Sequence, residues 1–345
     1  MRRLTLTAFF SASLACLALP AQAEDLLFTS NRDSGTFQLY RMAQDGSQIK
    51  RATAEPMVAA HIARSADGKR VAFVSVLQGR PDLYLLELAT GQTRQLTDDA
   101  AMESTPVWSP DGRQVVFQSY RDQTPKLYVV NADGTGLRRL THGSGEESAP
   151  AMSPDGRQVA YTVYRDRRDA QIHVVDLVSG KSTAIGARPA EGQENSVQWS
   201  PDGSRIAYVL FKDDLTHIQT MRPDGTDRQV LTQGKSRNND PQWSSDGKQI
   251  LFLSLRNGLA RQAIYAMNAD GSAQRELVGG SEEHFLARWS ADRNRLYFVR
   301  FHAGAGQIYV ADADGTRVQK LSDGAGYDAE LSLPTSSRPL ITAAR

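Results

Sequence analysis

The chain alternates between short hydrophobic runs and short polar stretches rich in Gly, Asp and Pro. Runs such as "QVVFQS" (114–119) and "KLYVVN" (126–131) contain many β-branched and aromatic residues and show no helical periodicity. Runs of this kind, bounded by turn-forming residues, predict short β-strands. The first run recurs as "QVAYTV", "RIAYVL" and "QILFLS", which indicates an internal repeat.

Two turn motifs mark the repeat. A Ser-x-Asp-Gly tetrad recurs every 44 to 47 residues, at Ser65, Ser109, Ser153, Ser200 and Ser244, with a degenerate copy at Ser290. A second turn ends in glycine seven times, at Gly46, Gly91, Gly134, Gly180, Gly225, Gly271 and Gly315. All four tryptophans directly precede the first serine of a tetrad, at Trp108, Trp199, Trp243 and Trp289. Pro-Asp-Gly favours a tight turn, because proline fixes φ and glycine accepts positive φ.

The repeat unit predicts the blade of a β-propeller. Each unit holds four strands, lettered a to d in chain order: strand a ends at the tryptophan, b and c are hydrophobic, and d is short and polar. Four antiparallel strands in about 46 residues are typical of propeller blades. The b–c–d part occurs seven times, and "YDAELSLPTS" (327–336) supplies the strand a that the first unit (26–53) lacks. We therefore expect an all-β, seven-bladed propeller, closed by the C-terminal strand a joining the N-terminal strands b, c and d.

The blade count leaves an alternative open. The segment "RPLITAAR" (338–345) resembles a further strand b, which would add a cap or compete with the strand at 26–30. Six or eight blades are therefore the other possibilities. In each case we expect residues 24–345 to form a single propeller domain.

The first 23 residues have the layout of a secretory signal peptide. Arg2 and Arg3 form a basic start, an apolar run follows, and Ala21-Gln22-Ala23 is an A-x-A cleavage site. The apolar run is too short to span a membrane, and no later segment is long enough. We expect cleavage after about Ala23 and export to the periplasm as a monomer. The only cysteine, Cys16, lies in the removed segment; its lipidation is an alternative for which the preceding residues match poorly.

Charge and motifs argue against two classes of function. The chain has 40 Lys and Arg against 39 Asp and Glu, whereas a nucleic-acid-binding protein is expected to carry a basic excess. The tetrad contains Ser and Asp, but a catalytic nucleophile is needed once and this motif repeats as a turn does. Neither G-x-S-x-G nor H-E-x-x-H occurs in the chain. We expect neither a nucleic-acid partner nor an enzyme of the common hydrolase types.

Acidic residues recur near the start of strand a. Five residues before the tryptophan column lie Ala59, Glu103, Glu147, Glu194, Asn238, His284 and Tyr327, and nearby positions add Glu146, Asp240, Glu283 and Asp328. Because strand a is the innermost strand, we expect these residues to converge at the rim of the central channel. Carboxylates gathered there repel one another unless a cation relieves them. The rim would suit Ca²⁺ or Mg²⁺, or the Lys or Arg of an entering peptide; the alternative is a hydrated polar mouth with ordinary counterions.

A basic-acidic pair recurs after strand b. It reads Arg-Asp at 32–33, 121–122 and 165–166, Lys-Asp at 212–213 and Arg-Asn at 256–257. One interpretation is a basic ring for an acidic partner, with contacts from Arg121, Arg165, Arg167 and Arg168. The other is an ion pair that shapes each loop.

The repeated sequence motifs resemble those of the WD-repeat-like propeller of the TolB family, which serves the Tol–Pal system of the periplasm. The resemblance covers residues 26–333 and rests on the tetrad, the tryptophan column and the Asp-Gly turn recurring in order. That family carries an N-terminal α/β domain and a six-bladed propeller, so the resemblance extends to the propeller alone. It implies a periplasmic, non-enzymatic scaffold that presents its loop face and central channel to an envelope protein or peptide.

A second resemblance keeps an enzymatic hypothesis open. Propeller lyases that act on pectic oligosaccharides hold a divalent metal with histidines at the channel rim. His61 and His284 both lie at the start of a predicted strand a. A metal-dependent carbohydrate-active enzyme that uses the rim is therefore the alternative function.

Overall fold

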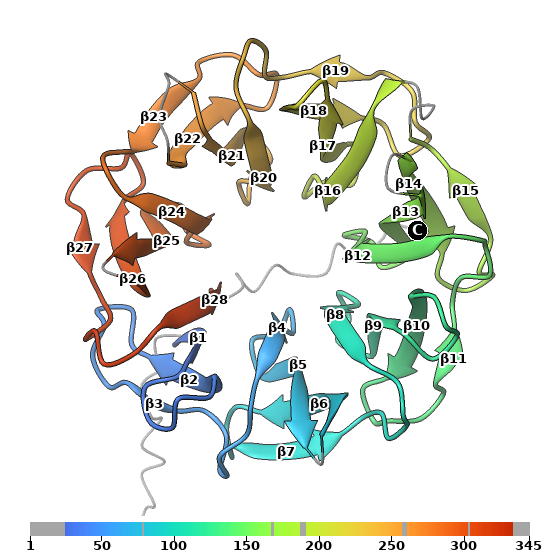
Figure 1. Ribbon diagram of the computed structural model, residues 1–345, viewed down its shortest axis with the longest axis vertical. Coiled ribbons are helices and arrows are strands. Elements are labelled where there is room, and N and C mark those ends of the chain that lie inside the picture. The colour runs from blue at the N-terminus through green and yellow to red at the C-terminus, as the bar shows by residue number, and fades with distance from the viewer. Residues whose placement is uncertain are drawn as a thin grey trace, which may run out of the picture.

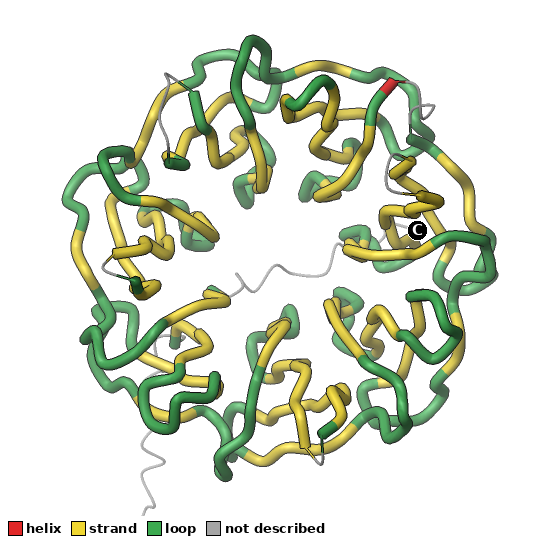
Figure 2. Tube along the Cα trace, in the orientation of Figure 1, coloured by secondary structure: helices red, strands yellow, loops and turns green. Residues whose placement is uncertain are grey.

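Seven small β-sheets stand in a ring around a central opening in the computed structural model of the protein (Figure 1). The structure describes residues 25–77, 79–166, 169–186, 191–256, 261–302 and 304–333. The predictions on the signal peptide (1–23), on Cys16, on Arg167 and Arg168, and on the segment 338–345 lie outside these residues. Strands joined by turns and loops make up nearly all of the described trace, apart from one short helical segment at residue 191 (Figure 2).

The seven sheets each hold four antiparallel strands, which confirms the predicted seven-bladed propeller. Blade 1 consists of β28 (Asp328–Ser332), β1 (Leu26–Ser30), β2 (Gln38–Met42) and β3 (Lys50–Arg51). Blade 2 consists of β4 (Ala60–Arg64), β5 (Arg70–Leu77), β6 (Arg80–Glu87) and β7 (Gln92–Gln95). Blade 3 consists of β8 (Glu103–Trp108), β9 (Gln114–Ser119), β10 (Lys126–Asn131) and β11 (Arg138–Arg139).

The other four blades follow the same order, with strand a innermost and strand d outermost (Figure 1). Blade 4 consists of β12 (Glu146–Met152), β13 (Gln158–Asp166), β14 (Asp169–Asp176) and β15 (Ser182–Ala184). Blade 5 consists of β16 (Gln193–Trp199), β17 (Ile206–Lys212), β18 (Leu215–Met221) and β19 (Gln229–Val230). Blade 6 consists of β20 (Asn238–Trp243), β21 (Gln249–Ser254), β22 (Ala263–Asn268) and β23 (Arg275–Val278). Blade 7 consists of β24 (Glu283–Trp289), β25 (Arg295–His302), β26 (Ala305–Asp312) and β27 (Gln319–Lys320).

The ring closes in blade 1, where the C-terminal strand β28 pairs antiparallel with the N-terminal strand β1 (Figure 1). This confirms the predicted closure and corrects its register. Asp328 pairs with Ser30 as Glu103 pairs with Ser119 in blade 3, so Asp328 occupies the column that the sequence assigned to Tyr327. The assignment was wrong by one residue because β28 ends without a tryptophan to anchor the alignment.

The hydrophobic core lies between neighbouring blades. Strand b contributes a fully buried aromatic ring in each of the seven blades, for example Phe73 in blade 2 and Phe117 in blade 3. One cluster joins Leu83 and Leu85 of blade 2 to Trp108 and Phe117 of blade 3. Because each sheet buries its faces against its neighbours, only the closed ring protects every blade from water.

The Ser-x-Asp-Gly tetrad forms the a–b turn, as its composition predicts. In blade 3 the hydroxyl of Ser109 donates to Asp111 Oδ1 over 2.6 Å and accepts from the backbone N–H of Gln114 at 2.9 Å. Gly112 completes the turn with a positive φ of 67°. The tryptophan before the tetrad ties the blade to its neighbour, since the indole N–H of Trp108 donates to the carbonyl of Ala63 in blade 2. The tetrad is therefore a repeated structural element.

Candidate functional site

Two faces of the ring carry different connections. The loops between strands b and c lie beside the starts of strand a, because Glu103 at the start of β8 pairs with Ser119 at the end of β9. We name this side the loop face. The Ser-x-Asp-Gly turns, for example 109–112, lie at the other end of the strands, on the side that we name the turn face.

Four of the predicted rim residues lie at the starts of the inner strands but are buried within the ring. These are Glu103, Glu147, Glu194 and Asp328, each at most 2% exposed. A carboxylate so removed from water needs a cation or several hydrogen-bond donors beside it. The protein supplies these partners from its own side chains and backbone.

In blades 1, 3 and 6 the residue at the start of strand a contacts the arginine of the basic-acidic pair that follows strand b. Arg32 contacts Asp328 at 3.0 Å, Arg121 contacts Glu103 at 2.6 Å, and Arg256 donates to Asn238 Oδ1 at 3.0 Å. Each of these arginines also donates to the last serine of strand b, namely Ser30, Ser119 or Ser254. Each guanidinium further lies over the tyrosine ring of strand c, at 4.4 to 5.2 Å from its centre. The arginine of this pair therefore joins strands a, b and c within a blade.

The buried glutamates of blades 4 and 5 have other hydrogen-bond and ion-pair partners. Glu147 accepts from the backbone N–H of Leu127 and lies 3.6 Å from Lys126 Nζ, both in blade 3. Glu194 contacts Arg228, which directly precedes strand d, at 2.8 Å and accepts from the N–H of Ile172 in blade 4. These carboxylates therefore connect neighbouring blades.

The other predicted residues are spread around the ring. Glu146 is exposed and Glu283 is half-buried. Asp240 contacts Arg288 of blade 7 at 3.0 Å. Arg165 is exposed and contacts Asp169 of its own blade at 3.3 Å. Asp240 and Arg165 therefore each form an ion pair with a nearby residue.

His284 is fully buried, and its Nδ1 lies 3.0 Å from the carbonyl oxygen of Gln262. Burial lowers the pKa of His284, so its imidazole is neutral at pH 7. His61 is exposed on β4, and blade 1 separates its blade from that of His284. Within the described ranges, no three His, Cys, Asp or Glu side chains come together as metal ligands. The Ca²⁺ or Mg²⁺ rim site predicted from the sequence gains no support from this arrangement.

Each inner strand contains a bulge that the sequence analysis missed. Two residues after the start column, seven non-glycine residues have φ between 45° and 55°: His61, Thr105, Ala149, Ser196, Asp240, Leu286 and Glu330. The a–b pairing shifts register at the same place in the seven blades. Positive φ is costly for a β-branched residue such as Thr105. No glycine or turn motif in the sequence marks this position.

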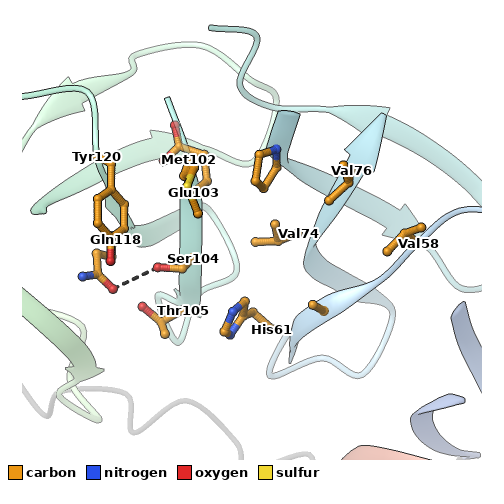
Figure 3. Close-up of a pocket in the computed structure, with 12 residues that line it drawn as sticks. Val58, His61, Val74, Val76, Met102, Glu103, Ser104, Thr105, Gln118 and Tyr120 are labelled. Atoms are coloured by element: carbon orange, nitrogen blue, oxygen red, sulfur yellow. Dashed lines mark hydrogen bonds between the residues drawn. The ribbon is translucent and has the colours of Figure 1, made fainter. Parts of the chain in front are cut away.

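A cavity of about 410 Å³ opens between blades 2 and 3 at the loop face (Figure 3). Its walls come from Val58, Ala60, His61, Val74, Val76 and Pro81 of one side and Met102, Glu103, Ser104, Thr105, Gln118 and Tyr120 of the other. Val76, Met102 and Tyr120 are 42%, 55% and 43% exposed, which is high for large apolar side chains. The described part of the chain therefore gathers exposed apolar surface around one opening.

Glu103 and Thr105, which line this cavity, each have a buried polar atom without a hydrogen-bond partner. Arg121 and Ser119 both donate to Glu103 Oε1, whereas Glu103 Oε2 is buried without a hydrogen-bond partner. Thr105 Oγ1 is likewise buried and unpartnered. Burial raises the pKa of Glu103 to about 7, although Arg121 acts to lower it. The sequence placed Glu103 in a set of rim acids but gave no sign of its free oxygen.

No helix among the described residues has the length and apolarity needed to cross a membrane. The search of curated proteins found no match to the chain. The structure is similar to TolB from Acinetobacter baumannii, with 23% identity and a TM-score of 0.57 over 76% of this chain and 65% of that one. It is also similar to an oligogalacturonate lyase from Vibrio parahaemolyticus, with 17% identity and a TM-score of 0.65 over 87% of this chain and 86% of that one. These likenesses show the propeller fold.

A further neighbour is a putative TolB from Agrobacterium tumefaciens, with 19% identity and a TM-score of 0.53 over 91% of this chain and 92% of that one. The chain spans 65% of the length of the A. baumannii protein. The family model described as the TolB beta propeller domain matches residues 57–149 and 147–336. These matches agree with the repeated tetrad and the seven blades, and the chain belongs to the TolB β-propeller domain family.

Proposed function

We propose that the protein is a non-enzymatic binding scaffold of the cell envelope that holds a protein partner on its loop face. The observation that carries this proposal is the group of exposed apolar side chains, Val76, Met102 and Tyr120, around the cavity between blades 2 and 3. Exposed apolar surface gathered beside a cavity is typical of protein-binding sites. Membership of the TolB β-propeller family supports the same class of function.

The proposed location is the periplasm. It rests on the basic start, apolar run and A-x-A site of residues 1–23, with cleavage after about Ala23. The residues after Ala23 contain no cysteine, so the exported chain depends on core burial in place of disulfides. The proposed working form is a monomer.

The enzymatic alternative has weaker support. A metal-dependent carbohydrate enzyme needs ligands that converge, and His61 and His284 lie in blades that blade 1 separates. His284 is also buried and bonded to Gln262. The likeness to an oligogalacturonate lyase is one of fold.

The test is capture of envelope proteins by chemical crosslinking to the immobilised mature protein. Replacing both Met102 and Tyr120 by lysine should reduce the captured protein by about tenfold or more, because it places charge in the apolar contact. The matched control replaces Val178 and Val230 by lysine in the same way. These are exposed apolar residues of blades 4 and 5 outside the loop-face cavity. The control should capture as much as the wild type. Equal capture by all three proteins would contradict the proposal.

A further inference from the structure

The mouth of the cavity between blades 2 and 3 is apolar. Val76 of blade 2 lies across the opening from Met102 and Tyr120 (Figure 3), and Pro81 also lines the cavity. Ala59 stands before the inner strand of blade 2 at the position where blades 3, 4 and 5 carry glutamate. Blade 2 therefore brings no carboxylate from this column to the space.

The floor of the cavity is acidic. Glu103 is 2% exposed, and one of its carboxylate oxygens has no hydrogen-bond donor. Leaving a buried acceptor unpaired is unfavourable, and more so when it is charged. A ligand that brings a donor to this oxygen recovers that free energy.

The charges around Glu103 favour a cation. Arg121 contacts both Glu103, at 2.6 Å, and Asp99, at 2.8 Å, so two carboxylates share one guanidinium. His61 on β4 lines the opposite wall, and the buried Asp82 of β6 interacts with Asp99 and Arg80. When Glu103 is ionised, the surroundings therefore carry an excess of negative charge.

We infer that this cavity binds a lysine side chain of the partner polypeptide, with its aliphatic stem between Val76 and Met102 and its ammonium group at Glu103. A lysine suits the site because its four methylenes pack on apolar walls while its ammonium group offers three donors. One of these donors suits Glu103 Oε2, the carboxylate oxygen that has no hydrogen-bond partner. The inference rests on the proposed function, since it names the group by which the partner is held.

The test follows the methyl signal of Met102 by NMR in mature protein labelled with ¹³C-methyl methionine. The signal is assigned with the Met102→Leu variant, and the probe is N-acetyl-lysine amide. We expect a saturable shift of the Met102 signal. The neutral norleucine and Nε-acetyl-lysine analogues should bind about tenfold more weakly or worse, because they lack the charged donor. This comparison uses the wild-type protein alone.

Glu103→Gln should weaken lysine binding by about tenfold or more while leaving the norleucine analogue unchanged. Wild-type affinity for lysine should rise between pH 6 and pH 8, because Glu103 loses its proton near its raised pKa of about 7. Equal binding of lysine and norleucine, or no shift with either, would overturn the inference. If lysine fails to bind while the Met102 and Tyr120 double variant still loses captured protein, the inference fails and the scaffold proposal stands. If lysine binds but the Met102 and Tyr120 double variant captures as much protein as the wild type, the scaffold proposal fails.

Discussion

Replacing Asp328 by alanine is expected to lower the free energy of unfolding by about 3–5 kcal/mol, the cost of breaking a buried ion pair. Asp328 is fully buried on β28 and contacts the buried guanidinium of Arg32, which follows β1, at 3.0 Å. Its removal leaves that guanidinium without its buried partner at the point where the two ends of the ring meet. Urea unfolding of the mature protein measures the loss.

A double-mutant cycle shows whether the pair itself carries this effect. Asp328→Ala combined with Arg32→Ala should cost less than the sum of the two single changes, because the double variant leaves no uncompensated charge. The matched control is Asp98→Ala, which removes an exposed partner of Arg80 at 3.6 Å. An exposed pair contributes about 0–1 kcal/mol. If Asp328→Ala were as mild as Asp98→Ala, the account of ring closure would be wrong.

Gly315→Ala is expected to destabilise the protein by about 2–4 kcal/mol through backbone strain and overpacking. Gly315 ends the c–d turn of blade 7 with a φ of 88°, a conformation that L-residues rarely adopt. A Cβ placed there would lie 2.1 Å from the carbonyl oxygen of Leu277 in blade 6. Since this contact is with backbone, the two blades would have to move apart.

Gly35→Ala is the matched control for this effect. Gly35 has a φ of 72°, but a Cβ there would meet nothing within 4 Å. Its replacement should therefore cost only the strain of positive φ, about 1–2 kcal/mol. Equal urea midpoints for the two variants would show that close packing between blades is not the reason for the repeated glycine.

The repeat made the fold predictable. Trp108 and its tetrad recur at one spacing, and a repeated turn with hydrophobic runs between its copies defines a blade. The structure adds a role for two of the tryptophans, because Trp108 and Trp199 bond to the backbone of the preceding blade. The register of β28 was missed by one residue because that strand lacks this anchor.

The side-chain directions in the candidate site were less predictable. The sequence placed Glu103 at the start of strand a but gave no indication that it turns inward to Arg121. The bulge at Thr105 has no sequence signal, since a β-branched residue seldom adopts positive φ. The cavity depends on which side chains two neighbouring blades bring together, which no pattern within one repeat can show.

Site-specific photo-crosslinking tests most directly whether the loop face binds the partner. A benzophenone amino acid replaces Met102 at the cavity mouth in one protein and Arg113, an exposed residue after the tetrad on the turn face, in another. Both proteins are irradiated in envelope extracts, and the adducts are compared by mass. A partner held on the loop face should give a discrete adduct from position 102 and none from position 113. An adduct from position 113 alone, or from neither position, would contradict this account.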